Sequence, residues 1–300
     1  MLKKLSLVLA LAGACFATVT YDYVREWPLA DAGCKGLVIS SADEVYLVSD
    51  HVYRYTTAGS LTASWALPAG GDAYDLCDNY QGYIFVGQFQ YYPSWNVKVL
   101  KYTGGGSLAA SYPLPQGYSI SPWALSGKNG NYVYLGGDGL LIGKMTANGS
   151  IVASWSRAGG YGKGMYASAS GHLYYTDSQN DKILRFTTNG SLVNTWGGTG
   201  GGAGRFQEPD DVACDVRGWV YVADFYNHRI QVFTAAGSFL GLWGKYGDGK
   251  TEFNGPYALD FDSQGLLYVN DTGNHRVQVF RFSNPAVAPA SLGKVKALFR

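Results

Sequence analysis

A short phrase recurs five times along the chain, and it restricts the possible folds more than any other feature of the sequence. Each copy begins with Gly-Ser and places an aromatic residue six positions after the glycine. The glycines are Gly59, Gly106, Gly149, Gly190 and Gly237, and the aromatic residues are Trp65, Tyr112, Trp155, Trp196 and Trp243. Successive copies start 41 to 47 residues apart, a period that is typical of proteins built from repeated supersecondary units.

Each period contains short stretches that predict four β-strands. Apolar first stretches cover 37–39, 123–125, 212–214 and 259–261. Second stretches cover 45–47, 83–86, 132–135, 173–175, 220–222 and 267–269, and third stretches cover 100–102, 184–186, 230–233 and 277–280. Gly, Asn and Asp separate the stretches, as in hairpin turns. Four-stranded units of this length predict the blades of a β-propeller.

The number of blades follows from two incomplete units. The five phrases supply outer strands for five blades, whereas a sixth unit at 256–282 has three strands and no phrase after them. Residues 23–27 have the aliphatic and aromatic positions of an outer strand. Because a closed ring removes exposed sheet edges, we expect this N-terminal strand to complete the last blade. The predicted fold is an all-β, six-bladed propeller with four-stranded blades.

The composition excludes several other classes of protein. Charged residues make up 15% of the 300 residues, whereas the chain contains 41 Gly and 24 Tyr. An average soluble domain has about 25% charged residues, so helical bundles and coiled coils are disfavoured. The 23 basic and 22 acidic residues give no electrostatic basis for a nucleic-acid partner.

Residues 1–17 differ from the repeats and predict an export signal. Lys3 and Lys4 precede an apolar run, and small residues at Ala14 and Ala17 suit cleavage. The run is too short to span a membrane in the mature protein. Cys15 is an alternative site for lipidation, although Ala12 stands where such signals usually carry a branched aliphatic residue. We therefore expect a secreted, periplasmic or cell-surface protein, with residues 18–284 forming the propeller and no transmembrane segment in the mature chain.

The cysteines and the C-terminal tail complete this outline. Cleavage would leave Cys34, Cys77 and Cys214, and an odd number excludes a simple disulfide framework. We expect Cys77 and Cys214 to be buried core residues. Residues 285–300 form a linker and a short basic amphipathic tail, which would serve in sorting or surface attachment, or else be a frayed or docked end.

Two copies of the repeat, at 206–233 and 253–280, resemble the NHL repeat. Both contain Asp-x-x-Asn-His-Arg between their second and third strands, and residues 175–183 form a degraded third copy. The residues concerned are Asp224, Asn227, His228 and Arg229 in one copy and Asp271, Asn274, His275 and Arg276 in the next. We interpret them as structural, with the Asp accepting turn amides, the Asn at positive φ and the Arg paired with the Asp.

The resemblance implies a fold with several unrelated functions. NHL propellers include RNA- or protein-binding modules, extracellular sensor domains and a peptidyl-amide-forming lyase, and related propellers hydrolyse lactones with a bound divalent metal. The family's lyases carry zinc-binding histidines near the starts of inner strands. The histidines here, His51, His172, His228 and His275, stand elsewhere. The histidine pattern therefore disfavours zinc lyase chemistry.

A calcium-dependent hydrolase would need carboxylates in the central channel. Asp75, Asp210, Asp211 and Asp260 lie in or near inner strands and are the candidates. Carboxylates beside turns are commonly solvated or capping groups. We expect no cofactor, and calcium is the alternative.

The clearest departure from the repeat lies at 87–96, where a turn expands between two strands. Aromatic rings alternate there with amides, at Phe89, Gln90, Tyr91, Tyr92, Trp95 and Asn96. In an exposed loop the rings would stack on sugar rings or peptide side chains, and the amides would bind hydroxyl or peptide groups. Alternatively, the loop folds onto its neighbour.

These observations predict a non-catalytic binding or sensing module for a peptide, glycan or protein partner on the propeller face that carries this loop. The competing prediction is a metal-assisted lyase or lactone hydrolase that uses the central channel. A structural or adhesive surface protein, attached through the tail, is the third alternative.

Overall fold

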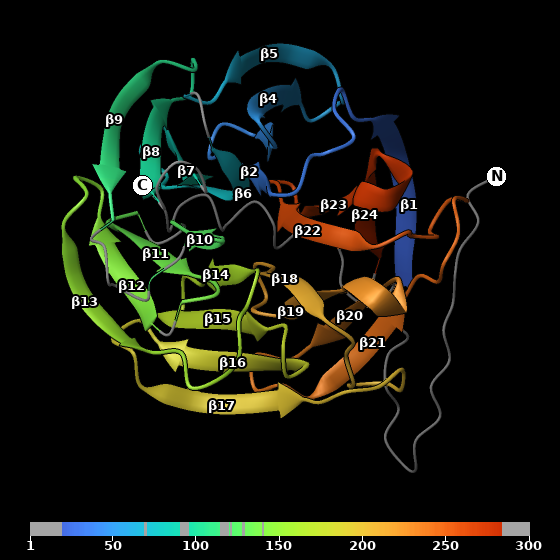
Figure 1. Cartoon of the computed structure of the whole chain (residues 1–300). Coiled ribbons are helices and arrows are strands. Elements are labelled where there is room, and N and C mark those ends of the chain that lie inside the picture. The colour runs from blue at the N-terminus through green and yellow to red at the C-terminus, as the bar shows by residue number, and fades with distance from the viewer. Residues whose placement is uncertain are drawn as a thin grey trace.

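The computed structural model describes residues 20–68, 71–90, 96–114, 120, 122–127, 130–139 and 141–283. These residues form six four-stranded antiparallel sheets arranged around a central axis (Figure 1), which confirms the predicted six-bladed β-propeller. Two 3-10 helices, η1 (Phe225–Asn227) and η2 (Thr272–Asn274), lie in the last two blades. Within these ranges no helix has the length and apolar character needed to cross a membrane.

Each blade runs from an inner strand at the axis to an outer strand at the rim. Blades 1 and 2 consist of β2 (Leu37–Ile39), β3 (Glu44–Val48), β4 (His51–Thr56) and β5 (Leu61–Ala66), then β6 (Asp72–Asp78), β7 (Tyr83–Gln90), β8 (Asn96–Thr103) and β9 (Leu108–Pro113). Blades 3 and 4 consist of β10 (Ala124–Ser126), β11 (Tyr132–Gly136), β12 (Leu141–Thr146) and β13 (Ile151–Ser156), then β14 (Met165–Ala167), β15 (His172–Asp177), β16 (Lys182–Thr187) and β17 (Leu192–Gly197). Blades 5 and 6 consist of β18 (Pro209–Cys214), β19 (Val220–Asp224), β20 (Arg229–Phe233) and β21 (Phe239–Trp243), then β22 (Pro256–Phe261), β23 (Leu266–Asp271), β24 (Arg276–Ser283) and β1 (Thr20–Pro28).

The core is divided among six apolar clusters, each between two neighbouring blades. The second strand of every blade contributes a large aromatic side chain that is at most 1% exposed. These side chains are Tyr46, Phe85, Tyr134, Tyr174, Tyr221 and Tyr268. Burying a side chain of this size contributes about 2 to 3 kcal/mol, so the Tyr-rich second strands are a main source of stability.

The N-terminal strand closes the ring as the sequence predicts. Strand β1 pairs antiparallel with β24, from Thr20 opposite Ser283 to Pro28 opposite Arg276. Arg25 also bridges to the next blade, since its guanidinium donates to the carbonyl oxygen of Thr57. Closure therefore joins segments from the two ends of the described chain.

The repeated phrase has a direct packing explanation. The aromatic residue at the end of one outer strand packs against the glycine that begins the phrase of the next blade. The pairs are Trp27 with Gly59, Trp65 with Gly106, Tyr112 with Gly149, Trp155 with Gly190 and Trp196 with Gly237. These glycines have φ between +85° and +92°, a region that favours glycine. Each glycine therefore both permits its turn and leaves room for an aromatic ring.

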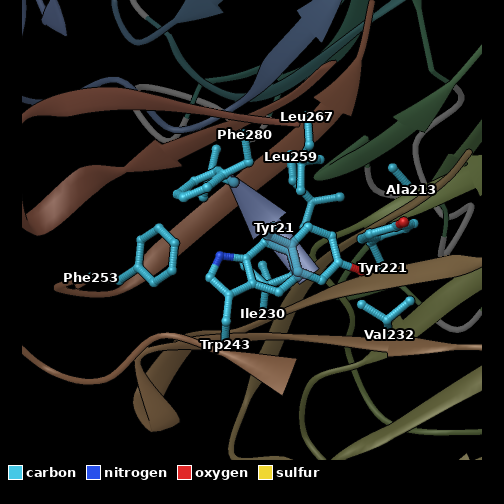
Figure 2. Close-up of a cluster of buried hydrophobic side chains, with 12 residues drawn as sticks. Tyr21, Ala213, Tyr221, Ile230, Val232, Trp243, Phe253, Leu259, Leu267 and Phe280 are labelled. Carbon is cyan, nitrogen blue, oxygen red and sulfur yellow. The ribbon is translucent and has the colours of Figure 1, made fainter. Parts of the chain in front are cut away.

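Closure changes this pattern at one junction, shown in Figure 2. Trp243 ends the fifth phrase, but no sixth phrase follows to provide a glycine. The ring of Tyr21 instead stacks on Trp243, with centroids 3.9 Å apart and planes inclined by 19°. Strand β1 thus covers Trp243 with Tyr21 and uses Trp27 to cover Gly59.

Several expectations are corrected or fall outside the described residues. The inner strand of blade 3 is Ala124–Ser126, one residue later than predicted. Among the described residues, Cys34, Cys77 and Cys214 form no disulfide bond, and the expected burial of Cys77 and Cys214 is confirmed. The export signal at 1–17 with Cys15, and the tail at 285–300, lie outside the described residues.

Candidate functional site

The two faces of the ring carry different connections. One face, here called the mouth face, carries the turns between second and third strands and the connections between blades. The opposite face carries the other hairpin turns. The connections at 198–208 and 244–255 on the mouth face are long. Loops held by a rigid scaffold commonly carry binding groups, so the mouth face is the candidate binding face.

The strand register aligns the starts of the six inner strands. The buried aromatic residue of each second strand faces one inner-strand residue, as Tyr46 faces Val38 and Tyr268 faces Asp260. The residue three places before that inner-strand residue lies within two residues of the start of each inner strand, on the mouth face. These six positions, here called the mouth ring, are Lys35, Tyr74, Trp123, Lys163, Asp210 and Tyr257.

One side of the mouth ring is aromatic. The rings of Tyr74 and Trp123 lie 5.3 Å apart at 34°. Phe89 packs edge-on against both, at 5.8 Å and 5.9 Å. The Lys35 ammonium sits 3.7 Å from the centroid of the Tyr74 ring, a cation–π distance. Tyr74 and Trp123 remain partly exposed while Phe89 is buried, so two supported rings are available to a ligand.

The other side of the mouth ring is charged. Lys163 Nζ lies 2.7 Å from Glu208 Oε1 and 2.8 Å from Asp210 Oδ1. The hydroxyl of Tyr161 donates to Glu208 Oε1 at 3.4 Å. The Tyr257 ring lies beside this group, with its centroid 5.7 Å from Lys163 Nζ. Two carboxylates and an ammonium, from the start of blade 4, from blade 5 and from the connection between them, thus lie together at this part of the mouth ring.

Burial sets the protonation of this charged group. It raises the pKa of Asp210 to about 7, and the nearby Lys163 ammonium opposes the rise. Burial would lower the pKa of Lys163, but Asp210 and Glu208 outweigh it and the pKa is raised. Lys163 therefore stays charged at neutral pH, whereas Asp210 changes its charge there.

Below the mouth ring, the central channel contains a small cavity. Asp75, Asp211 and Asp260 line it together with Ser126 and Tyr166, and no histidine is among its lining residues. The cavity offers about 30 Å³ to the centres of water molecules. The cavity is therefore small.

The channel carboxylates accept backbone hydrogen bonds between blades. Asp75 Oδ2 accepts from the N–H of Leu125 at 2.7 Å, and Asp211 Oδ2 accepts from the N–H of Leu259 at 2.8 Å. Asp260 joins the last blade to the first in the same way. Burial raises the pKa of Asp75 and Asp211 well above the usual range. These side chains therefore satisfy amides at the inner edges of the sheets.

The four aspartates considered for a metal occupy two different settings. Asp75, Asp211 and Asp260 face the cavity, whereas Asp210 pairs with Lys163 at the mouth. In the described part of the chain, no group of three or more His, Cys, Asp or Glu side chains is arranged to hold a metal ion.

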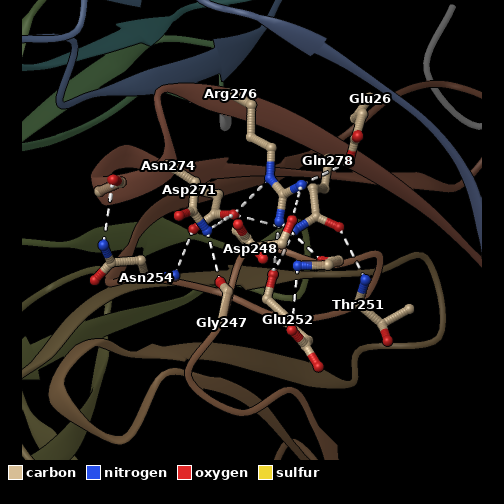
Figure 3. Close-up of polar contacts among 12 residues, drawn as sticks. Glu26, Gly247, Asp248, Thr251, Glu252, Asn254, Asp271, Asn274, Arg276 and Gln278 are labelled. Atoms are coloured by element: carbon tan, nitrogen blue, oxygen red, sulfur yellow. Dashed lines mark hydrogen bonds and ion pairs between the residues drawn. The ribbon is translucent and has the colours of Figure 1, made fainter.

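The Asp-x-x-Asn-His-Arg segments hold the long connections on the mouth face. In Figure 3, Arg276 donates to Asp271 Oδ2 and to the carbonyl oxygens of Asp248, Gly249 and Glu252 at 2.8 to 3.0 Å. Asn274 donates to the carbonyl oxygen of Gly247. In the preceding blade, Arg229 bonds Asp224 and the carbonyl oxygens of Gly201, Gly202 and Arg205, and Asn227 bonds that of Gly200. We call each set an arginine clasp.

The geometry of these segments differs from expectation in two details. The positive φ expected at the asparagine occurs at His228 and His275, with φ of 53° and 54°. The Asp224 carboxylate accepts the backbone N–H of Gln207, in the connection between blades, rather than a backbone N–H of its own turn. His228 Nδ1 accepts the N–H of Gly255 at 3.0 Å, so this ring is held in its neutral form.

The expected aromatic loop at 87–96 is shorter than the sequence suggests. Strand β7 continues to Gln90 and β8 begins at Asn96, so residues 87–90 belong to a sheet rather than a loop. Phe89 is 1% exposed and supports Trp123 instead of facing a ligand. Asn96 is exposed. Tyr91, Tyr92 and Trp95 lie outside the described residues.

No motif in the sequence marked Tyr74, Trp123 or Lys163 as binding residues. Aligning the six inner strands on the aromatic residues of the second strands would have identified the mouth ring. The contact between Lys163 and Glu208 could not be foreseen, because it depends on how the 157–164 and 198–208 connections meet.

The sequence matches the family model of the NHL repeat at residues 206–233 and 253–280. No curated protein matches the chain. Among solved structures, a streptogramin B lyase shares 17% identity with a TM-score of 0.62, over 88% of this chain and 98% of that one. An auxiliary nutrient binding protein from Bacteroides ovatus shares 14% with a TM-score of 0.63, over 83% and 69%. A chain of the mitotic checkpoint complex shares 12% with a TM-score of 0.59, over 92% and 95%. At these identities the likeness is one of fold alone.

Proposed function

Because this chain belongs to the NHL-repeat β-propellers, we propose that it is an exported, non-catalytic binding or sensing module. It holds a peptide, glycan or protein partner at its mouth face. The observation that carries this proposal is the mouth ring, which combines the rings of Tyr74 and Trp123 with Lys163 and its two carboxylates. Binding sites usually combine such apolar surface with a few polar groups.

The channel beneath the ring supports binding rather than catalysis. Its carboxylates accept inter-blade amide hydrogen bonds, so they already have a structural role, and the cavity that they line is small. Binding a ligand at the mouth ring requires no reactive group in the channel.

A direct test is binding to immobilised peptide and glycan panels. We expect the wild-type protein to retain specific members and Trp123→Ala to lose them, since Trp123 forms half of the aromatic side. Val216→Ser is the matched control, because Val216 is 62% exposed and lies on the opposite face. Equal loss in the control, or unchanged binding by Trp123→Ala, would contradict the proposed site.

A metal-assisted lyase or lactone hydrolase in the channel is the second candidate. The observation in its favour is that Asp75, Asp211 and Asp260 line one cavity, and one protein of similar fold is a streptogramin B lyase. Elemental analysis of purified protein separates the candidates. Stoichiometric calcium or zinc that is lost in Asp75→Asn would favour the enzyme, whereas a metal-free protein that binds its ligand would favour the binding module.

Export is a separate part of the proposal and rests on residues 1–17. Sequencing the N-terminus of protein recovered from outside the cytoplasm tests it. Cleavage after Ala17 is the expected result, and protein that keeps Met1 to Ala17 would contradict export by this signal.

A further inference from the structure

The mouth ring divides into two sectors of different chemistry. Its aromatic sector consists of Tyr74 and Trp123, supported from behind by Phe89. Its polar sector consists of Lys163 with Glu208, whose side chains keep 20% and 24% of their surface exposed. A pyranose has the same division, with an apolar C–H face and an edge of hydroxyl groups.

The mouth ring holds charges of both signs. Lys35 and Lys163 are balanced by Glu208 and Asp210 above pH 7, where Asp210 is ionised, and the Lys163 ion pairs are 2.7 and 2.8 Å long. Above this pH the four groups together carry no net charge. The site offers donors and acceptors side by side, which suit hydroxyl groups because each hydroxyl can both donate and accept.

The cavity below the mouth ring is small, with about 30 Å³ for the centres of water molecules. Peptide recognition usually depends on an anchor side chain in a desolvated pocket. A sugar ring needs instead a platform on which to lie, and the partly exposed ring of Trp123 provides one.

We propose that the mouth ring binds a neutral carbohydrate, with one sugar stacked on Trp123 and its hydroxyls bound by Glu208 and Lys163. This inference rests on the proposed binding function and narrows it to one ligand class. The sugar lies across the channel entrance without entering it. Lys163 donates to a hydroxyl oxygen, and Glu208 accepts a hydroxyl hydrogen.

The test is calorimetric titration with uncharged gluco-, xylo- and manno-oligosaccharides of two to six sugars, followed in parallel by tryptophan fluorescence. We expect saturable binding of at least one series by the wild-type protein. Trp123→Ala should weaken it tenfold or more, and Trp123→Phe should retain most of it because a platform remains. Glu208→Gln, which keeps the shape of the side chain, should weaken it several-fold without loss of folding.

Val216→Ser on the opposite face is the control and should bind as the wild type does. Two outcomes separate this inference from the proposed function. If no oligosaccharide binds but a peptide does, and Trp123→Ala abolishes the peptide binding, the carbohydrate assignment is overturned and the binding function stands. If neither sugars, peptides nor proteins bind, both fail.

Discussion

A single glycine position shows how the repeat stabilises the ring. Gly190 has φ of +92°, and a Cβ there would lie 2.6 Å from the Trp155 ring of the preceding blade. Gly171, in the same blade, has φ of +78° but open space around it. The two positions therefore separate backbone strain from loss of packing.

We expect Gly190→Ala to lower the free energy of unfolding by about 3 kcal/mol, because strain at positive φ adds to a displaced tryptophan. Gly171→Ala should lower it by roughly 1 kcal/mol through strain alone. Urea denaturation of both variants measures the difference. Equal losses would show that the ring contact contributes nothing.

Asp210 makes stability depend on pH. Its pKa is raised to about 7 in the folded protein, so the folded state keeps a proton that the unfolded state releases near pH 4. Stability from this group is therefore fully present below pH 4 and is lost as pH rises through 7.

Asp210→Asn removes this dependence, while Glu208 still neutralises Lys163. Relative to the wild type, the variant should gain roughly 2 to 3 kcal/mol of stability between pH 5 and pH 8, from about two pH units at 1.36 kcal/mol each. Chemical denaturation at the two pH values measures the gain. If the stabilities of the wild type and the variant changed with pH in the same way, the pH dependence would come from another group.

The arginine clasps hold the connections between blades in a fixed conformation. Arg276 binds three carbonyl oxygens of the 244–255 connection as well as Asp271. Lysine carries the same charge but lacks the planar fork of donors. We expect Arg276→Lys to increase hydrogen exchange in 245–252 at least tenfold. Arg281→Lys, at an exposed position of the same strand, should leave exchange unchanged; a similar increase there would mean that the clasp is not responsible.

Strands that depend on local sequence pattern are predicted well, and features that depend on contacts between distant segments are not. Second and third strands follow from apolar pattern and turn residues, and the sixth blade follows from an outer strand at 23–27. The strand at residues 87–90 was not predicted, because a long hairpin and a loop of aromatic residues have the same composition. The hairpin forms because these residues pair with 96–99. The amide bonds of Asp75 and Asp211 depend on how neighbouring blades are placed, which no local pattern encodes.

Over the whole molecule, stability depends on closing the ring with β1. This strand covers Trp243 through Tyr21 and Gly59 through Trp27, so its loss opens two junctions between blades. We expect deletion of residues 20–28 to lower the Tm by 10 °C or more. Addition of a synthetic 20–28 peptide should restore part of it. A deletion variant that melts like the intact protein would contradict closure by β1.

Ligand binding at the mouth face can be tested by amide hydrogen exchange with and without a ligand from the panels. We expect the ligand to slow exchange in segments that meet at the mouth ring, which are 72–76, 157–164 and 206–211. Exchange should not change in the turns of the opposite face, at 40–43, 168–171 and 215–219. Protection confined to those turns would contradict binding at the mouth face.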